Sequence, residues 1–316
     1  MESYPFLSAD FERCKQLVAP FVHRTPVLHS SQIDNLAGAE IFFKCENFQR
    51  AGSYKIRGAM HALLRLQEGG PISAVVTHSS GNFAQALSLA AKNAGIPAHI
   101  VMPNNAPEVK KKGVHAYGGQ ITECLPTLTH REREAERLTQ ETNGVFIHPS
   151  NDPMVMLGQG TACAELLEEI PNLTHVVAPV GGGGLLGGTA LAASFSETAC
   201  QPVGAEPAAV DDAYRSLQTG RIEGNTTTDT VADGLKTVLG SFTFPIIYNH
   251  VGVIVRVEES EIIAAMRLIW ERMKIVVEPS SAVALAAVLA DPARFKGGRV
   301  GILVSGGNVD LERLPF

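Results

Sequence analysis

Short apolar, β-branched runs alternate with longer segments of helical periodicity from residue 72 onward. Strands are predicted in the first half at 72–77, 99–102, 120–124 and 145–148, and helices between them at 82–93, 108–117 and 130–142. Glycines and prolines such as Gly95 and Pro103 end individual elements. Strands that alternate with helices indicate parallel βαβ units, with a sheet buried on both faces.

The alternation continues in the second half of the chain. Strands are predicted at 175–178, 251–257 and 299–304, and helices at 157–170, 185–195 and 259–273. The stretch 219–230 is polar and rich in glycine and threonine, which predicts a surface loop. The pattern favours an α/β protein, and the length of 316 residues is enough for two compact lobes.

The composition is typical of a globular protein and does not indicate nucleic-acid binding. The chain is 45% hydrophobic and 18% charged, and its formal net charge of −6 argues against nucleic-acid binding. The five cysteines show no CxxC spacing and are expected to be reduced. The start of the chain lacks a signal-peptide pattern and no apolar run reaches the ~20 residues of a membrane span, so we expect a cytoplasmic protein.

Lys55 lies among small and apolar residues, in the sequence Gly-Ser-Tyr-Lys-Ile-Arg-Gly of residues 52–58. Its ordinary interpretation is a surface lysine at the start of a helix. A lysine that forms an imine must instead lose its proton near neutral pH. Burial, or a neighbouring cation such as Arg57, would lower its pKa into that range.

Ser79, Ser80, Gly81 and Asn82 follow a predicted strand directly and open the next predicted helix. Backbone N–H groups at a helix N-terminus bind anions such as a carboxylate, and the hydroxyl and amide groups add further donors. The alternative is an ordinary serine N-cap with a glycine turn. Both interpretations fit these four residues taken alone.

Four consecutive glycines precede the helix predicted at 185–195, and they are Gly181, Gly182, Gly183 and Gly184. They allow backbone N–H groups to converge on a phosphate at a helix N-terminus. A rival interpretation makes Gly182, Gly184 and Gly187 a GxGxxG fingerprint with Glu206 as the ribose-binding acid. The chain would then be an NAD(P)-dependent oxidoreductase.

Ser305 follows the predicted strand 299–304 and precedes Gly306 and Gly307. A serine at this place can bond the ring nitrogen of a cofactor, and the glycines permit close approach. Alone, the segment is no more than a strand-to-turn signal. The NAD(P) hypothesis leaves this segment, Lys55 and the serine pair unexplained.

Taken together, these segments resemble the fold-type II pyridoxal 5′-phosphate (PLP) enzymes, and among them the serine racemase and serine/threonine dehydratase family. 3-Hydroxyaspartate ammonia-lyases are close relatives in that family. The similarity extends from Arg24 to Asp310 and is strongest to eukaryotic-type serine racemases, through the segments 43–46, 76–82 and 270–274. It covers nearly the whole chain.

The resemblance implies an α/β fold of the tryptophan synthase β type, with two lobes and parallel-rich twisted sheets. Residues 1–73 and 152–316 would form a large PLP-binding domain and residues 74–151 a small domain. The implied function is racemisation or β-elimination of a small 3-hydroxy amino acid such as serine or threonine. 3-Hydroxyaspartate is the alternative substrate, elimination would give a 2-oxo acid and ammonia, and the implied assembly is a homodimer.

The resemblance also assigns roles at the substrate. Lys55 would form the imine with PLP and act as acid/base on one face, and Ser80 would act on the opposite face. Ser79, with nearby backbone amides, would bind the α-carboxylate of the amino-acid substrate, and Ser80 and Asn82 would also contact the substrate. Arg131 matches an arginine that reaches a second substrate carboxylate in relatives, which keeps 3-hydroxyaspartate as a candidate.

Further roles concern the cofactor. Asn82 would bind the phenolic oxygen of PLP, Ser305 would meet its pyridine nitrogen, and Tyr54 would lie against its ring. The glycines at 181–184 would hold its phosphate. A neutral serine at the ring nitrogen makes the cofactor ring withdraw electrons less strongly. Racemisation or loss of the β-hydroxyl group is then favoured over transamination.

A divalent-cation site and a nucleotide effector are also implied. Glu206, Asp212 and the Val210 carbonyl would bind Mg²⁺ or Ca²⁺, which prefer such hard oxygen ligands. The alternative is an acidic helix start. The effector site would lie near a set of polar residues, namely Ser30, Ser31, Lys274 and Asn308.

Two positions depart from the family pattern. Phe83 stands where the family commonly has histidine, and Ser150 stands where the racemases have asparagine. Both positions lie near the substrate or the cofactor in relatives, so strict serine preference is in doubt. Loss of the polar group at position 83 would suit a bulkier or less polar substrate side chain.

Overall fold

The computed structural model describes residues 6–106 and 108–316 and contains two sheets. The six-stranded sheet has the order β1 (Val27–His29), β2 (Glu40–Cys45), β10 (Arg299–Val304), β7 (His175–Pro179), β8 (Gln201–Pro207) and β9 (Val253–Val257). Within it β1 is antiparallel to β2, and the other neighbours pair in parallel. The four-stranded sheet is parallel, in the order β5 (Gln120–Cys124), β4 (Ala98–Pro103), β3 (Val75–His78) and β6 (Val145–Phe146).

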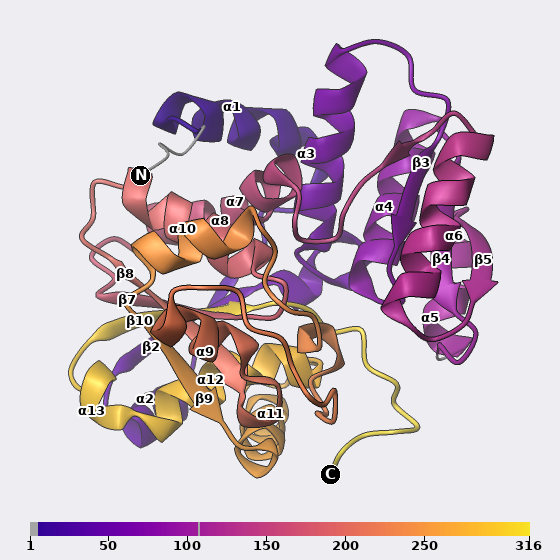
Figure 1. Cartoon of the computed structure of the whole chain (residues 1–316). Helices are drawn as coiled ribbons and strands as arrows, with labels where there is room; N and C mark the ends of the chain where they lie inside the picture. Colours follow the sequence, from indigo (N-terminus) through magenta and orange to yellow (C-terminus); the bar gives the residue numbers. More distant parts are fainter. Residues whose placement is uncertain (1–5, 107) are drawn as a thin grey trace.

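Helices surround both sheets (Figure 1). The four-stranded sheet is accompanied by α4 (Asn82–Ala94), α5 (Glu108–Ala116) and α6 (Leu128–Glu141). Around the six-stranded sheet lie α1 (Ser8–Val18), α2 (Ser31–Ala37), α7 (Pro153–Glu169), α8 (Gly184–Phe195), α9 (Asp212–Thr219), α10 (Thr243–His250), α11 (Glu259–Met273), α12 (Pro279–Ala290) and α13 (Pro292–Phe295). The helix α3 (Lys55–Glu68) contacts both α7 and α4 and therefore lies at the junction of the two parts.

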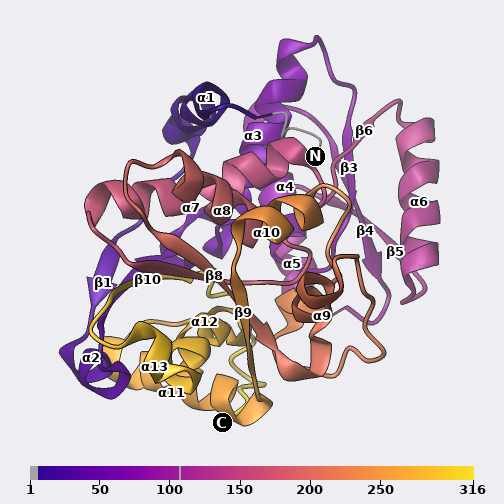
Figure 2. The same ribbon diagram turned by 60° about the vertical axis from the view of Figure 1, so that its left-hand side comes forward.

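The four-stranded sheet is an insertion into the six-stranded part (Figure 2). The chain enters it once, between α3 and β3, and leaves it once, between β6 and α7. The entering strand β3 pairs directly with the leaving strand β6, through Val75 with Val145 and Val76 with Phe146. Because the two strands are parallel, the entering connection lies before β3 and the leaving connection lies after β6, at the opposite edge of the sheet.

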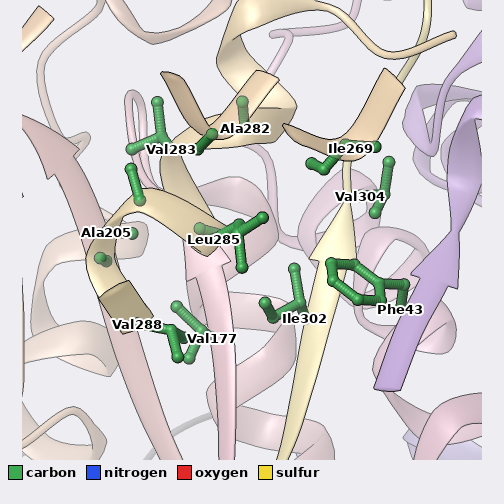
Figure 3. Packing of buried hydrophobic residues seen from close by; sticks show 14 of the residues in the cluster. Phe43, Val177, Ala205, Ile269, Ala282, Val283, Leu285, Val288, Ile302 and Val304 are labelled. Atoms are coloured by element: carbon green, nitrogen blue, oxygen red, sulfur yellow. The ribbon is translucent and has the colours of Figure 1, made fainter. Parts of the chain in front are cut away.

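The main core lies between the six-stranded sheet and the helices α11 and α12 (Figure 3). Val177, Ile302 and Phe43 from neighbouring strands face Leu285 and Val288 of α12, and all five are fully buried. The helix α12 is apolar on all sides, as expected for a helix enclosed by protein. The sequence analysis did not predict it because a short apolar run without a polar face has no helical period.

The α/β class and the predicted alternation of strands and helices are confirmed, with shifts at the ends. The helix predicted at 157–170 begins earlier, at Pro153, because Asp152 caps it by accepting hydrogen bonds from Met154 N and Val155 N. Residues 220–232 form no helix or strand, in agreement with the predicted loop. The domain bounds 1–73, 74–151 and 152–316 stay a prediction. In the ranges that the structure describes, no helix is long and apolar enough to cross a membrane.

Candidate active site

Lys55 opens α3 directly beside the end of strand β10. Tyr54 N donates a hydrogen bond to Ser305 O at 3.1 Å, and Ser53 forms a β-bridge with Gly306. The Lys55 amine donates to the Pro149 carbonyl at 3.1 Å and lies 4.9 Å from the centre of the Tyr54 ring. Burial lowers the pKa of Lys55 to about 8, although a nearby carboxylate partly opposes the shift. An amine with this pKa is a nucleophile near neutral pH.

Arg57 is not the cation that lowers the pKa of Lys55. Its guanidinium is fully buried, donates to both oxygens of Glu46 at 2.7 and 2.8 Å, and pairs with Glu165 at 2.7 Å. Glu165 also pairs with the buried Lys44 at 2.7 Å. Two cations and two carboxylates thus form a neutral cluster at the first turn of α3, whose Arg57 is a structural residue.

The serine-rich segment connects β3 to α4. The N-cap position is occupied by Gly81, and no side chain caps it, so the ordinary serine N-cap is wrong. The Ser80 hydroxyl forms no hydrogen bond within the part of the chain that the structure describes. Phe83 is buried, and the centre of its ring lies 6.0 Å from the Lys55 amine, which places this departure from the family pattern at the reactive group.

Asn82 lies in a chain of side-chain hydrogen bonds. Its Nδ2 donates to Glu278 Oε1 at 2.7 Å, and its Oδ1 accepts from Asn308 Nδ2 at 2.9 Å. Asn308 Nδ2 also donates to Ala51 O at 2.8 Å. The amide of Asn82 is therefore held in one orientation by two residues that are distant in the sequence, and Ala51 in turn fixes one of them.

Glu278 is a site residue that the sequence analysis missed. It precedes α12, is 5% exposed, and its N–H donates to Gly306 O at 3.1 Å. Burial raises the pKa of Glu278 to about 8, and the Asp233 charge adds to this shift. An acidic residue directly before a proline and an apolar run signals a helix start, but it does not show that the carboxyl group is buried at a site.

Ser305 directly follows β10, and its side chain is buried. Its Oγ lies 3.0 Å from Ser281 Oγ, and Ser281 Oγ also accepts from Gly306 N and donates to Gly306 O, both at 2.7 Å. The hydroxyl is therefore held beside the start of α3. Ser305 thus lies beside the segment that carries Lys55, and its role at the cofactor stays a prediction. Ser53, which bridges to Gly306, keeps a buried hydroxyl without a hydrogen-bond partner in the described chain.

The glycine loop leads from β7 into α8 with uncapped backbone N–H groups. Gly183 has a φ of 84° and occupies the N-cap position, where no side chain bonds the first turn. A Cβ on Gly181 would lie 2.8 Å from Leu235 Cα, so packing excludes a larger residue there. A bare helix N-terminus built from glycines suits a phosphate group, as the PLP interpretation requires.

Glu206 does not have the position of a ribose-binding acid. Its two oxygens accept hydrogen bonds from Ala213 N at 2.9 Å and Tyr214 N at 2.8 Å, at the start of α9, and it is fully buried. The NAD(P) hypothesis is therefore wrong about Glu206, the residue to which it assigned the binding of the ribose.

Glu206 and Asp212 lie close together in the interior. Burial raises the pKa of both carboxyl groups, to about 6 for Asp212, and the Asp212 charge raises the pKa of Glu206 further. Asp212 accepts hydrogen bonds from Asn225 Nδ2 at 2.6 Å and Leu239 N at 3.1 Å. Val210 is buried in the adjoining turn. Within 6–106 and 108–316 no group of three or more histidine, cysteine or acidic side chains forms a metal cluster.

Two histidines and Arg131 come from the four-stranded part, and His148 lies within electrostatic range of Lys55. His148 Nδ1 accepts from Ser150 N at 3.1 Å and Asn151 N at 2.8 Å, and burial lowers its pKa to about 4, with His78 and Lys55 adding to the shift. The imidazole is therefore neutral, with its proton on Nε2. Arg131 is partly exposed, and its charge helps to lower the pKa of His78.

An ion pair joins the two parts of the molecule beside the serine-rich segment. Lys110 of α5 pairs with Asp233, which lies in the turn Asp233–Leu235 of the six-stranded part. The Lys110 amine is 3.9 Å from the place that a Cβ on Gly81 would occupy. This pair therefore holds the Ser79 to Asn82 connection near the remaining site residues.

The predicted effector residues do not form one cluster of contacts. Ser30 occupies the N-cap position of α2 without a side-chain capping bond, and Lys274 follows α11 with a φ of 59°. Asn308 is instead bonded to Asn82 and Ala51 on the side of Lys55. The effector site, including Ser31, stays a prediction.

Comparison with known proteins agrees with this geometry. Residues 18–306 match the family model described as "Pyridoxal-phosphate dependent enzyme". The chain is 47% identical to the β-hydroxyaspartate dehydratase of Paracoccus denitrificans (strain Pd 1222) over 99% of this chain and 98% of that protein. It is 45% identical to the serine racemase of Dictyostelium discoideum over 96% and 95% of the two chains. The structure of maize serine racemase superposes with a TM-score of 0.95 at 43% identity, over 98% of this chain and 95% of that one. The chain belongs to the family of pyridoxal-phosphate dependent enzymes.

Proposed function

We propose that the chain uses PLP to remove the α-proton of a small 3-hydroxy amino acid, such as serine or threonine, and to expel its β-hydroxyl group as water. Hydrolysis of the product releases a 2-oxo acid and ammonia, and return of the proton to the other face gives the enantiomer. The observation that carries this proposal is the amine of Lys55, whose pKa burial lowers to about 8, beside Ser305 and the uncapped starts of α4 and α8. Bound PLP supplies the electron sink that makes the α-proton acidic.

The residues of the chain divide the remaining tasks. Lys55 takes or returns the α-proton on one face, and Ser80, whose hydroxyl is uncommitted to any described residue, does so on the other. Ser79 and the free N–H groups at the start of α4 bind the α-carboxylate. Asn82, fixed by Glu278 and Asn308, would offer its remaining N–H to the phenolic oxygen of the cofactor.

A second group of residues binds the cofactor. The glycines at 181–184 bind the phosphate through backbone N–H groups, and Tyr54 lies against the ring. Ser305 presents a neutral hydroxyl to the pyridine nitrogen. A neutral partner stabilises a protonated ring less than a carboxylate would, which favours loss of the hydroxyl group or return of the proton over transamination.

3-Hydroxyaspartate is the second candidate substrate. Arg131 forms no ion pair with any residue in the described ranges, and its charge is felt by His78 on β3, so a guanidinium is available for a second carboxylate. The 47% identical protein of Paracoccus denitrificans is named a β-hydroxyaspartate dehydratase. The buried Phe83 stands near Lys55 in place of a polar residue. A substrate with a second carboxylate would therefore depend on Arg131 to bind that group.

The experiment compares substrates in the purified enzyme. L- and D-serine, L-threonine, the diastereomers of 3-hydroxyaspartate and phenylserine are incubated in turn, and 2-oxo acid and enantiomer are measured separately. Arg131→Gln should reduce kcat/KM for hydroxyaspartate and leave that for serine nearly unchanged. An enzyme that turns over none of these amino acids would refute the proposal, and equal losses for serine and hydroxyaspartate would remove Arg131 from the second-carboxylate role.

A divalent cation, Mg²⁺ or Ca²⁺, is proposed to bind Glu206, Asp212 and the Val210 carbonyl. The support is chemical: two buried carboxylates lie close together, and neither forms an ion pair with a lysine or arginine of the described chain. The neighbouring Asp211 forms ion pairs with both nearby arginines, Arg215 and Arg256. Hard oxygen ligands without a counter-cation fit such an ion.

The wider setting of the enzyme is also a proposal. A homodimer in the cytoplasm, regulated by a nucleotide near Ser30, Ser31, Lys274 and Asn308, is what the sequence resemblance implies. Light scattering at micromolar concentration tests the dimer. Equilibrium dialysis with ATP tests the effector, and Lys274→Ala should abolish the binding.

A further inference from the structure

Thr243 lies against the glycine loop from the side of α10, the helix that it opens. Its side chain is fully buried, and its Oγ1 donates a hydrogen bond to Gly182 O at 2.9 Å. The same oxygen is 2.7 Å from the place that a Cβ on Gly183 would occupy. The loop that leads into α8 is therefore held by a side chain 61 positions after Gly182.

The Thr243 hydroxyl is engaged both as donor and as acceptor. Gly240 N donates to Thr243 Oγ1 at 2.9 Å, which fixes the oxygen. A hydroxyl has one hydrogen to donate, and its other nearby acceptor, Gly240 O, lies farther away at 3.3 Å. The shorter contact, to Gly182 O, is the better hydrogen bond.

The segment before Thr243 is bonded to two other parts of the chain. Leu239 N donates to Asp212 Oδ2 at 3.1 Å, at the start of α9. Phe242 N donates to Asn151 Oδ1 at 2.8 Å, in the connection before α7. Thr243 therefore holds the glycine loop from a segment that is itself fixed on both sides.

The direction of Gly182 O determines the direction of the next N–H group. In a trans peptide the C=O and N–H bonds point to opposite sides. Since Gly182 O faces Thr243, the N–H of Gly183 faces the other side of the loop. This N–H has no acceptor among the residues that the structure describes, and Gly183 occupies the N-cap position of α8 with a φ of 84°. An anion at the start of α8 would accept it.

We infer that Thr243 is a positioning residue for the phosphate of PLP: by holding Gly182 O, it turns the N–H of Gly183 toward that phosphate. The inference rests on the proposed function only in taking the glycine loop as the phosphate site. Thr243 acts from the side of the loop opposite to the phosphate. Its loss therefore misdirects a donor and removes no contact with the cofactor.

The test compares PLP with pyridoxal, which lacks the phosphate. The full chain is freed of cofactor with hydroxylamine, and Kd values for both compounds are measured by titration. Thr243→Val should raise the Kd for PLP about tenfold, as for the loss of one hydrogen bond, with the Kd for pyridoxal within about twofold. Thr243→Ser keeps the hydroxyl and should bind PLP as the wild type does.

Thr189→Val is the matched control. Thr189 is a fully buried threonine of α8, and its hydroxyl forms no hydrogen bond within the described chain. Its replacement should change neither Kd. If Thr243→Val folds poorly, as judged by its Tm, Thr243→Cys takes its place, because a thiol is a weak donor and should give the same selective loss for PLP.

The two ligands separate positioning from general stability. Equal losses for PLP and pyridoxal in Thr243→Val would show a merely structural threonine and overturn the inference. Equal Kd values for PLP in the valine and serine variants would overturn it as well. A wild type that binds PLP no more tightly than pyridoxal would refute the phosphate site together with the inference. Selective binding of PLP without turnover of any hydroxy amino acid would refute the proposed function alone, and the Kd values of the variants would still decide the role of Thr243.

Discussion

The side-chain amide of Asn82 donates a 2.7 Å hydrogen bond to Glu278, so the connection after β3 is joined to the start of α12 across the two parts of the molecule. Glu278 is also the carboxyl group whose charge raises the pKa of Lys55 against the effect of burial. One buried acid thus contacts the residue proposed to bind the cofactor's oxygen and influences the reactive amine.

The pH dependence of cofactor capture should follow from this pair. The pKa of Lys55 is lowered to about 8, so the neutral amine accumulates as pH rises through about 8, and the rate of imine formation by apoenzyme should rise over that interval and then level. The pKa of Glu278 is raised to about 8, so its carboxylate charge appears in the same interval and favours the charged amine. Glu278→Gln removes that charge, so the midpoint should move to lower pH. Stopped-flow absorbance measures the rate, and Glu123→Gln, an exposed acid on β5, is the control. A midpoint near the ordinary lysine value of 10.5 would contradict the buried position of Lys55.

Borohydride reduction of the holoenzyme should fix the cofactor on Lys55 alone. Lys55 has the lowered pKa, whereas Lys110, which also lies near the serine-rich segment, is engaged with Asp233. Peptide mapping by mass spectrometry locates the label. Lys55→Arg should prevent labelling and abolish activity, while Lys110→Arg should still be labelled at Lys55. A label on any other lysine disproves the assignment.

Ser80→Ala should separate racemisation from elimination. Loss of an acid/base group typically costs about 10²–10⁴-fold in rate. Racemisation and reaction of D-substrates should fall by that factor, because they need a group opposite Lys55. Elimination from L-substrates should fall far less, because their α-proton faces Lys55. Enantiomer and 2-oxo acid are measured in the same samples, with Ser79→Ala as a comparison that should raise KM instead. Unchanged racemisation in Ser80→Ala would place the second acid/base elsewhere.

Ser305→Asp should change the spectrum and the partition of the reaction. The anion would favour a protonated pyridine ring, which strengthens the electron sink. A new long-wavelength absorption band with substrate, or gain of transamination, is the expected result. Ser281→Ala removes only the partner that lies 3.0 Å from Ser305 Oγ and serves as control for disturbed packing. A variant with the wild-type spectrum and product ratio would show that Ser305 does not meet the ring.

Chelation should lower both activity and thermal stability, and added Mg²⁺ or Ca²⁺ should restore them. Bound cation stabilises the folded state by mass action, by about 2.7 kcal/mol at a hundredfold excess over Kd. Glu206→Gln and Asp212→Asn should lose the cation dependence of Tm, whereas Asp211→Asn, which breaks surface ion pairs, should keep it. If the Tm of the wild type changes neither with chelator nor with added cation, the two acids do not bind a metal ion.

The sequence predicts the parts of the site whose chemistry is local. Lys55, Ser305 and the glycine loop are each marked by neighbours in the chain, and the strands that carry them are short apolar runs. Glu278 was missed because its role depends on contacts with Asn82, 196 positions away. Arg57 was given a role at Lys55 that the ion pairs with Glu46 and Glu165 exclude, since the direction of a side chain is set by tertiary partners.

The connection that returns the chain from β6 to α7 contacts the reactive amine. Pro149 lies in that connection, and its carbonyl accepts from the Lys55 amine at 3.1 Å. The chain passes between the two parts of the molecule here and between α3 and β3. An amine that has become bonded to carbon has fewer hydrogens to donate. Reaction of Lys55 therefore weakens a hydrogen bond between the start of α3 and the segment by which the chain leaves the inserted sheet.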